Sequence, residues 1–272
     1  MSNSKYEYVK QLEEHSTLLK NTSIVVRIDG KGFTKFCDTH QFEKPNDING
    51  IKLMLLSGFN VMKNFTDIFL GYGQSDEFSF VFKKKTNLFN RRGEKILTNI
   101  VSQFSSSYVY YWSKIFKDKK ELKFPPCFDG RIILYPDFIN LKDYFSWRFV
   151  DCHINNLYNT TFWALVQKGG LNTQEAHNKL KGTFSKDKNE ILFKDYNINY
   201  NNEPEIFKKG SLIIRLLDNI ENQVKKEFKY DPLLIKEDDF TKEFIESNKN
   251  LVVAHMDVIN DSFWDKTKIN FD

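Results

Sequence analysis

DIFLGYGQSDEFSFVF, residues 67–82, contains two runs of strand-forming residues on either side of a polar Gly-Gln-Ser tip. This pattern predicts a β-hairpin. Upstream, TSIVVRIDG at residues 22–30 is a short β-branched run that stops at Asp-Gly, which predicts a buried strand followed by a turn. Residues 47–65 carry apolar side chains at close to helical spacing, with Asp47 as the expected N-cap. The chain therefore opens as strand, helix and hairpin.

The segments that follow the hairpin complete one folding unit. Their patterns predict a helix, a strand and a long helix over residues 93–116, 127–135 and 143–168. The order β-α-β-β-α-β is typical of ferredoxin-like domains. We therefore expect an α+β fold, an antiparallel sheet with helices on one face, plus additional C-terminal helices.

The chain changes character beyond about residue 218. It becomes rich in Lys, Glu and Asp, with scattered apolar triplets at 233–235 and 251–253. No linker rich in Pro, Gly or Ser separates this part from the rest. The pattern predicts a peripheral helical appendage rather than an independent domain.

Composition excludes several classes of protein. The 272 residues carry a net charge of +4, and 40% are hydrophobic, so a basic nucleic-acid wrapper and a disordered chain are both excluded. No apolar run approaches the roughly 20 residues that a membrane-spanning helix needs. The three cysteines show no metal-binding spacing, which favours a reducing compartment without structural zinc. A cytoplasmic location is expected, with a mitochondrial one as the alternative.

Two acidic residues follow neighbouring strands of the predicted sheet. Asp29 ends the first strand, and Asp76 lies where the second strand of the hairpin begins. Carboxylates that meet there suit Mg²⁺, and two such ions roughly 3.5 to 4 Å apart support phosphoryl transfer. Gly30 would let its carbonyl approach an ion. Glu77 ranks below Asp76, because successive strand residues point to opposite faces.

Each of these acids also has an ordinary interpretation. Asp-Gly and Ser-Asp are common turn dipeptides, so the prediction of a metal site depends on both acids ending adjacent strands. RRGEK at residues 91–95 opens a predicted helix, where cations oppose the helix dipole. A bound anion such as a triphosphate would explain those cations, and a solvated basic corner is the alternative.

The long helix contains an unusual polar stretch, DCHINNLYNT at residues 151–160. Asn is a weak helix former, and His153, Asn156 and Thr160 share one face. These side chains could bind a base edge or a ribose, or could make contacts between helices. Further on, SKDKNEILF at residues 185–193 has capping-box-like spacing, and its lysines could also contact phosphate.

These stretches together resemble the tRNA-His guanylyltransferase family, which includes related 3′-to-5′ polymerases. The resemblance covers residues from about 3 to 217 and is carried by NSKYEYVK, RIDGKGF, KPND, YGQSDEFSFVF, RR(x)2K, FDGR, SWR(x)2DCHINNLYNT, DKNEIL, NYNNEP and KKG. It implies a polymerase palm domain over residues 1–140, a helical and strand extension over 141–217 that packs on the palm, and a peripheral part over 218–272.

The resemblance also implies an activity. Members of the family use ATP to activate the 5′-monophosphate of a tRNA, and the 3′-hydroxyl of GTP then attacks, which adds guanosine at position −1 of tRNA-His. Two Mg²⁺ ions assist, ATP and GTP are substrates, and members assemble as homotetramers. Alternatives are a template-dependent polymerase that repairs 5′-truncated tRNAs, a non-catalytic tRNA-binding module, and a nucleotide cyclase on the same fold.

Matching motifs assign roles to single residues. Catalysis and metal binding are expected of Asp29, Gly30, Asp76 and Glu77. Nucleotide binding is expected of Lys31, Gly32, Phe33, Thr34, Lys44, Asp47, Ser75, Arg92 and Lys95. Contacts with the tRNA or its 5′ end are expected of Arg27, His153, Asn156, Lys188 and Asn199. Thr34 departs from the family, which usually has His there facing the incoming base, so base preference is less defined than the chemistry.

Overall fold

The computed structural model describes residues 4–14, 16–117, 119–215 and 250–267. Its strands are β1 (Ser23–Gly30), β2 (Ile68–Gln74), β3 (Glu77–Phe82), β4 (Phe128–Tyr135), β5 (Ser211–Arg215) and β6 (Leu251–Ala254). Its α-helices are α1 (Phe33–Thr39), α2 (Ile48–Asn64), α3 (Gly93–Phe116), α4 (Phe138–Gln167), α5 (Thr173–Leu180), α6 (Ser185–Tyr196), α7 (Glu205–Lys209) and α10 (Asp261–Thr267). Short 3-10 turns are η1 (Glu7–Leu12), η2 (Leu88–Arg91) and η3 (Tyr200–Asn202).

The six strands form one antiparallel sheet in the order β4-β1-β3-β2-β5-β6. The predicted order β-α-β-β-α-β is confirmed for residues 23–135, and the first strand pairs with the second strand of the hairpin, as the placement of the two acids requires. The hairpin is closed by a two-residue turn, Ser75 and Asp76, in which Ser75 has a φ of +49°.

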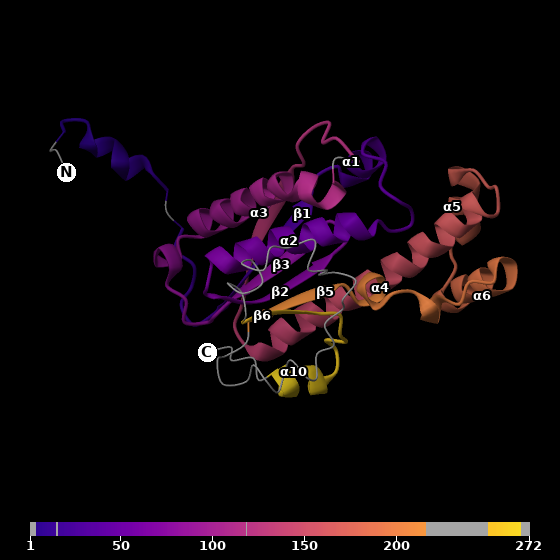
Figure 1. Ribbon diagram of the computed structural model, residues 1–272. Helices are drawn as coiled ribbons and strands as arrows, with labels where there is room; N and C mark the ends of the chain where they lie inside the picture. The colour runs from indigo at the N-terminus through magenta and orange to yellow at the C-terminus, as the bar shows by residue number, and fades with distance from the viewer. Residues whose placement is uncertain (1–3, 15, 118, 216–249, 268–272) are drawn as a thin grey trace.

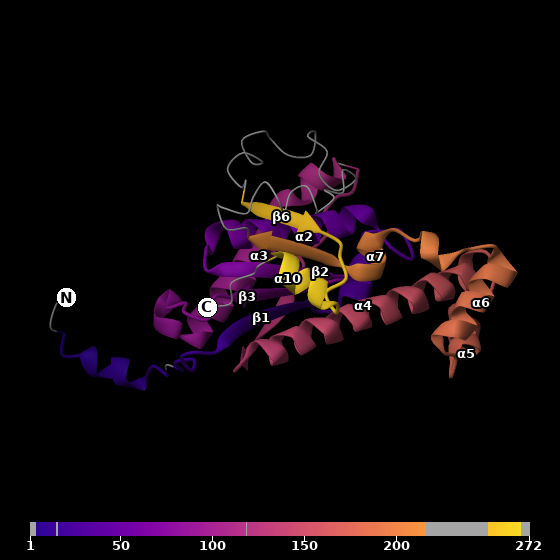
Figure 2. The same ribbon diagram turned by 90° about the horizontal axis from the view of Figure 1, so that it is seen from below.

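Helices cover both faces of the sheet (Figures 1 and 2). The predicted helices α2 and α3 pack on one face around a core that includes Phe78, Phe80 and Phe104. Helix α4 and helix α10 cover the other face, where Phe145 and Trp264 pack against strand residues such as Val25. The expectation of helices on one face therefore holds for α2 and α3 only, because the apolar side of α4 buries the opposite face.

Helix α4 begins earlier than the apolar pattern predicted. The side chain of Asp137 accepts a hydrogen bond from the backbone N–H of Asn140 at 2.9 Å, and this cap starts the helix at Phe138 instead of residue 143. The helix then extends past the sheet and carries α5 and α6 away from the palm (Figure 1). Its outer half packs on α6 and η3 through Leu157, Leu192 and Tyr200.

The C-terminal part of the chain is less peripheral than predicted. Leu251, Val252 and Val253 form strand β6, pair with β5 and are buried, so this triplet extends the sheet and is not part of a helix. A run of three β-branched or leucine side chains fits a pleated, buried strand. Residues 233–235, the other triplet, lie outside the described residues. The proposed division of the chain at 140 and 217 stays a prediction.

Candidate active site

The turn of the hairpin brings the two predicted acids together. The backbone N–H of Gly30 donates to the carbonyl oxygen of Asp76 at 3.1 Å, which ties the end of β1 to the turn. Burial raises the pKa of the Asp76 carboxyl, and the nearby charge of Asp29 adds to this rise, while a hydrogen bond from Ser75 opposes it. A shared cation would offset the cost of keeping the Asp76 carboxylate charged beside Asp29.

Glycine is required at position 30 by the closeness of its neighbours. A Cβ atom there would lie 2.3 Å from Cδ2 of Phe33 and 2.8 Å from Oδ2 of Asp76. Phe33 is buried in the core and cannot move aside at low cost. The backbone of Gly30 therefore lies directly against the Asp76 carboxylate, as a cation bound between them would need.

Gly30→Ala is expected to lower catalytic turnover by at least roughly tenfold, because the added methyl group displaces the Asp76 carboxylate. Steady-state kinetics of the purified variant would measure this, with circular dichroism to show that the fold is retained. Gly170→Ala is a control elsewhere on the chain, since a Cβ atom at that position meets nothing within 4 Å and only its φ of +68° is strained. Wild-type turnover in Gly30→Ala would contradict the expectation.

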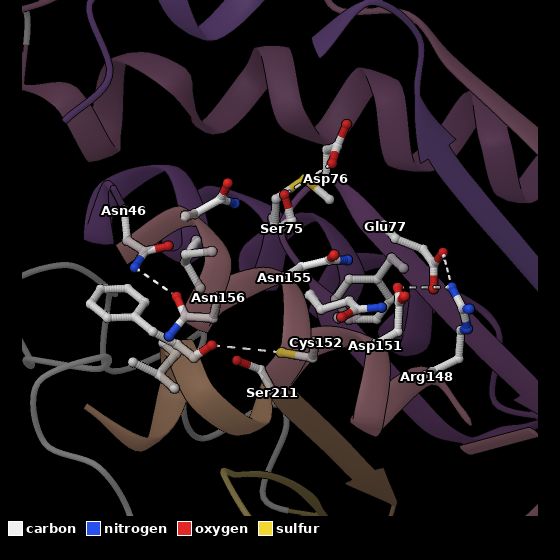
Figure 3. Close-up of a pocket in the computed structure, with 18 of the residues that line it drawn as sticks. Asn46, Ser75, Asp76, Glu77, Arg148, Asp151, Cys152, Asn155, Asn156 and Ser211 are labelled. Atoms are coloured by element: carbon white, nitrogen blue, oxygen red, sulfur yellow. Dashed lines mark hydrogen bonds and ion pairs between the residues drawn. The ribbon is translucent and has the colours of Figure 1, made fainter. Parts of the chain in front are cut away.

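Glu77 lies on the opposite side of the turn from Asp76 (Figure 3). It is 12% exposed, and its carboxylate accepts a hydrogen bond from Arg148 at 3.0 Å and lies 3.8 Å from Nε of Arg27. Burial raises the pKa of the Glu77 carboxyl, and the two arginine charges oppose that rise. Arg27, predicted to contact RNA, is thus engaged with Glu77 and lies 5.8 Å from the ring of Trp147.

The acids suit a metal that needs few protein ligands. Within the described residues, no group of three or more His, Cys, Asp or Glu side chains is arranged to hold a metal ion. Magnesium commonly takes one or two carboxylates and completes its shell with water and phosphate oxygens. Asp29 and Asp76, with the uncovered backbone of Gly30, fit that requirement.

Two hollows meet at Ser75 and Asp76. The larger, of about 470 Å³, is lined by residues that include Phe33, Thr34, Lys44, Asp47, Ser75 and Asp76. The other, of about 430 Å³, is lined by Asp29 and Glu77 from the strands and by Arg148, Asp151, Asn155 and Asn156 from α4 (Figure 3). Each is large enough for a nucleotide-sized ligand. Asp76 therefore lies where two ligands could meet, and Asp29 lines the smaller of the two hollows beside it.

The charged side chains of Lys44 and Asp47 both have partners within the protein. The ammonium group of Lys44 pairs with Asp38 at 2.9 Å and lies 5.5 Å from the ring of Trp163. The carboxylate of Asp47 caps α2 by accepting hydrogen bonds from the N–H groups of Asn49 and Gly50, and its second oxygen pairs with Lys120. The predicted N-cap role of Asp47 is confirmed. Its role toward a nucleotide stays a prediction.

The basic corner at the start of α3 divides into two parts. Arg91 points inward and is 3% exposed, and its guanidinium donates to the carbonyl oxygens of Leu18, Leu19, Lys84, Thr86 and Thr22. The idea that Arg91 joins an anion site is therefore wrong, because its donors are used inside the fold. Arg92 and Lys95 remain at the surface side of the corner beside Phe89, and Lys31 and Gly32 are exposed in the turn after β1.

The predicted RNA-contacting residues lie along α4 and the segments packed on it. Asn156 is buried, donates to the hydroxyl of Tyr200 at 3.0 Å and accepts from Asn46 at 2.9 Å, so it joins elements, which was the alternative interpretation. His153 lies 5.5 Å from the ring of Tyr200, and burial lowers its pKa. Asn199 caps η3. The structure thus gathers His153 and Asn156 around Tyr200.

Lys188 lies on α6, in the outer lobe that α5, α6 and the outer half of α4 form. Its ammonium group donates to the carbonyl of Thr183 at 2.8 Å and lies 6.0 Å from the ring of Tyr158. The expected cap at this helix involves a different pair, because the N–H of Phe184 donates to the Asp187 carboxylate at 2.8 Å. Tyr158 is also bound to His177, and both line the larger hollow.

Sequence reasoning missed several residues that line the site. Arg148, Asp151, Asn155 and Asn159 recur along one side of α4 and line the smaller hollow. Their spacing of three to four residues was a usable signal, because polar residues repeated in this way share a helix face. Asp151, Asn155 and Asn159 belong to the polar stretch 151–160, but the functional face predicted there was that of His153, Asn156 and Thr160.

Known protein families and individual proteins match this chain over most of its length. The family model described as tRNAHis guanylyltransferase matches residues 6–136, and the model described as Thg1 C terminal domain matches residues 139–260. A tRNA(His) guanylyltransferase of Neurospora crassa is 50% identical over 98% of this chain and 94% of that protein. This chain belongs to the tRNA-His guanylyltransferase family.

Solved structures of this family share the fold. The crystal structure of tRNA(His) guanylyltransferase from Saccharomyces cerevisiae matches with a TM-score of 0.74 and 52% identity, over 77% of this chain and 93% of that chain. A bacterial tRNA(His) guanylyltransferase (Thg1)-like protein in complex with ATP matches with a TM-score of 0.66 and 25% identity, over 78% and 88% of the two chains. The palm-like α+β fold is therefore confirmed.

Proposed function

We propose that this chain is a nucleotidyltransferase that adds guanosine from GTP to the 5′ end of tRNA-His, after ATP has activated the 5′-monophosphate. The observation that carries the proposal is the position of Asp76 at the junction of two nucleotide-sized hollows, with Asp29 lining one of them. Relatives in fungi and other eukaryotes that are named tRNA(His) guanylyltransferase or probable tRNA(His) guanylyltransferase are 46–50% identical over almost all of this chain. This similarity supports the same chemistry here.

The proposed reaction has two transfers. In the first, a 5′-phosphate oxygen of the RNA attacks the α-phosphorus of ATP and releases pyrophosphate. In the second, the 3′-hydroxyl of GTP attacks the 5′-phosphorus of the RNA and releases AMP. Both transfers need two reactants to meet in line at one phosphorus atom, and the shared rim at Ser75 and Asp76 provides such a meeting point.

Two Mg²⁺ ions held by Asp29, Asp76 and the carbonyl of Gly30 would stabilise the charge that develops on the transferring phosphorus. Around them, the chain's own residues orient the reactants. Lys44, Asp47 and Ser75 are proposed to bind the activating nucleotide, and Thr34, next to Phe33, is proposed to face the incoming base. Arg92 and Lys95 are proposed to hold a triphosphate. Lys31 and Gly32, at the opposite end of β1, are proposed to contact a nucleotide beside Asp29.

The tRNA is proposed to lie along α4 and the outer lobe, where it would contact His153, Lys188 and Asn199, while the buried Asn156 supports this surface from within. With a net charge of +4, local basic surfaces rather than overall charge would steer it. A homotetramer would supply more of that surface. No helix in the described part of the chain is long and apolar enough to cross a membrane. Cysteines 37, 127 and 152 are all free, which supports a reducing compartment such as the cytoplasm.

The proposal is tested with purified protein, Mg²⁺, ATP and GTP on two 5′-labelled substrates, tRNA-His and another tRNA lacking its first nucleotide. We expect guanosine to be added to tRNA-His, and no product without ATP when the RNA starts as a monophosphate. Template-matched repair of the shortened tRNA would favour the general 3′-to-5′ polymerase. Binding of both RNAs without any product would favour the non-catalytic module.

A further inference from the structure

In the sheet, Glu77 is the direct neighbour of Asp29, whereas Asp76 is not. Asp29 and Glu77 are partners in the β1–β3 register, so their side chains leave the same face of the sheet. Asp76 belongs to the turn instead. By backbone geometry alone, Glu77 would be the natural second ligand for a cation bound at Asp29.

The side chain of Arg148 changes that assignment. Its guanidinium comes from α4 and donates to Oε2 of Glu77 at 3.0 Å (Figure 3). Nε of Arg27 lies 3.8 Å from the same oxygen. Trp147 covers the guanidinium of Arg148, whose central carbon lies 3.4 Å from the ring centroid. The side chains of Arg148 and Glu77 are only 7% and 12% exposed, so water screens this pair weakly.

The pair is not arranged for the greatest stability. Nε of Arg148 and Oε1 of Glu77 are buried and lack a hydrogen-bond partner among the described residues. Arg148 also lies 3.5 Å from Asp151, so one guanidinium is shared by two acids. A buried ion pair with unsatisfied atoms contributes little net stability, which points to a role in the neighbouring site.

We propose that Arg148 is a positioning residue that holds Glu77 out of the cation site, so that cation binding falls to Asp29 and Asp76. The inference rests on the metal assignment in the proposed function. Without Arg148, the buried Glu77 carboxylate loses its hydrogen-bonded cation and keeps only the more distant Arg27, 3.8 Å away. It relieves that cost by joining the cation site or by repelling the Asp29 carboxylate. Either change displaces the bound cation from the position that catalysis uses.

The test measures Mn²⁺ binding to nucleotide-free protein, by the loss of the free-ion signal in electron paramagnetic resonance. For Arg148→Met we expect the Mn²⁺ dissociation constant to change by at least roughly fivefold and kcat for guanosine addition to fall by roughly tenfold or more, with the KM for tRNA little changed. In the double variant Glu77→Gln with Arg148→Met, the freed carboxylate is absent, so Mn²⁺ affinity returns to the wild-type value and kcat rises well above that of Arg148→Met.

Two further variants keep the test decisive if Arg148→Met folds poorly. Glu77→Gln alone is isosteric and should bind Mn²⁺ as the wild type does, because Glu77 is not a ligand. Arg148→Lys keeps the charge and should also bind Mn²⁺ normally. Circular dichroism and the melting temperature establish that each variant is folded.

Some outcomes overturn the proposal. A tenfold weaker Mn²⁺ affinity in Glu77→Gln would make Glu77 a ligand. A raised KM for tRNA in Arg148→Met that the double variant does not reverse would make Arg148 an RNA contact. Unchanged Mn²⁺ binding in Arg148→Met would remove the positioning role. If the wild type binds Mn²⁺ but adds no guanosine to any RNA, the proposed function fails while the Mn²⁺ measurements still decide this inference.

Discussion

Asp76→Asn is expected to reduce guanosine addition by roughly a thousandfold or more, because the amide removes one of two charged ligands from the cation site. Single-turnover kinetics with labelled tRNA-His would measure the loss. The same variant should bind Mn²⁺ weakly. Asp29→Asn should behave in the same way, since both acids share the site.

The thermal stability of Asp76→Asn should not fall with its activity. Burial, and to a smaller extent the charge of Asp29, raise the pKa of Asp76, so the ionised carboxylate costs the folded, metal-free protein stability relative to the unfolded chain. Neutral asparagine should therefore leave the melting temperature unchanged or slightly raised. Asp143→Asn, an exposed acid on α4, is the matched control and should keep near wild-type activity. Activity in Asp76→Asn close to that of the control would disprove the metal assignment.

Arg91→Met is expected to lower the free energy of unfolding by about 3 kcal/mol or more. The guanidinium satisfies carbonyl oxygens from two separate segments, residues 18–22 and residues 84–86, and methionine would leave them buried without donors. Urea denaturation followed by circular dichroism would measure the change. Thermal melting should show a drop of roughly 5 to 10 °C.

Arg92→Met is the matched control for this measurement. Arg92 is the next residue, is partly exposed and donates to a single carbonyl oxygen, that of Phe89. Its loss should cost less than about 1 kcal/mol, although a triphosphate-binding role would lower activity. Equal destabilisation of the two variants would show that the buried hydrogen bonds of Arg91 carry little of the stability.

The sequence predicted the palm well because its strands and helices are locally consistent. The run IVV in β1 and the paired runs around Ser75 have no competing helical pattern, and α2 carries its own cap at Asp47. Strand β6 was missed because three apolar residues in a charged region fit a helix or a strand equally well. Only pairing with β5, far away in sequence, decides the choice.

The site was predicted in part for a similar reason. Asp29 and Asp76 could be paired from topology, since both lie at the ends of neighbouring strands. The partners of Arg91 and Glu77 could not be predicted, because the sequence does not show whether the partner of a charged residue lies in a distant segment. Arg148 is 71 residues from Glu77, and no local pattern links the two.

The pairing of β2 with β5 also bears on how the chain is made. Leu70 lies opposite Ile214, so the hairpin leaves the ribosome more than a hundred residues before its neighbouring strand. Until then the outer edge of β2 has unpaired backbone groups, the kind of edge that recruits other chains. A nascent chain that stalls before Ser211 would thus expose the unpaired edge of β2 on a nearly complete palm, and that edge is prone to aggregation. The cell would need fast elongation through the outer lobe, or a chaperone on that edge, to obtain the enzyme in good yield.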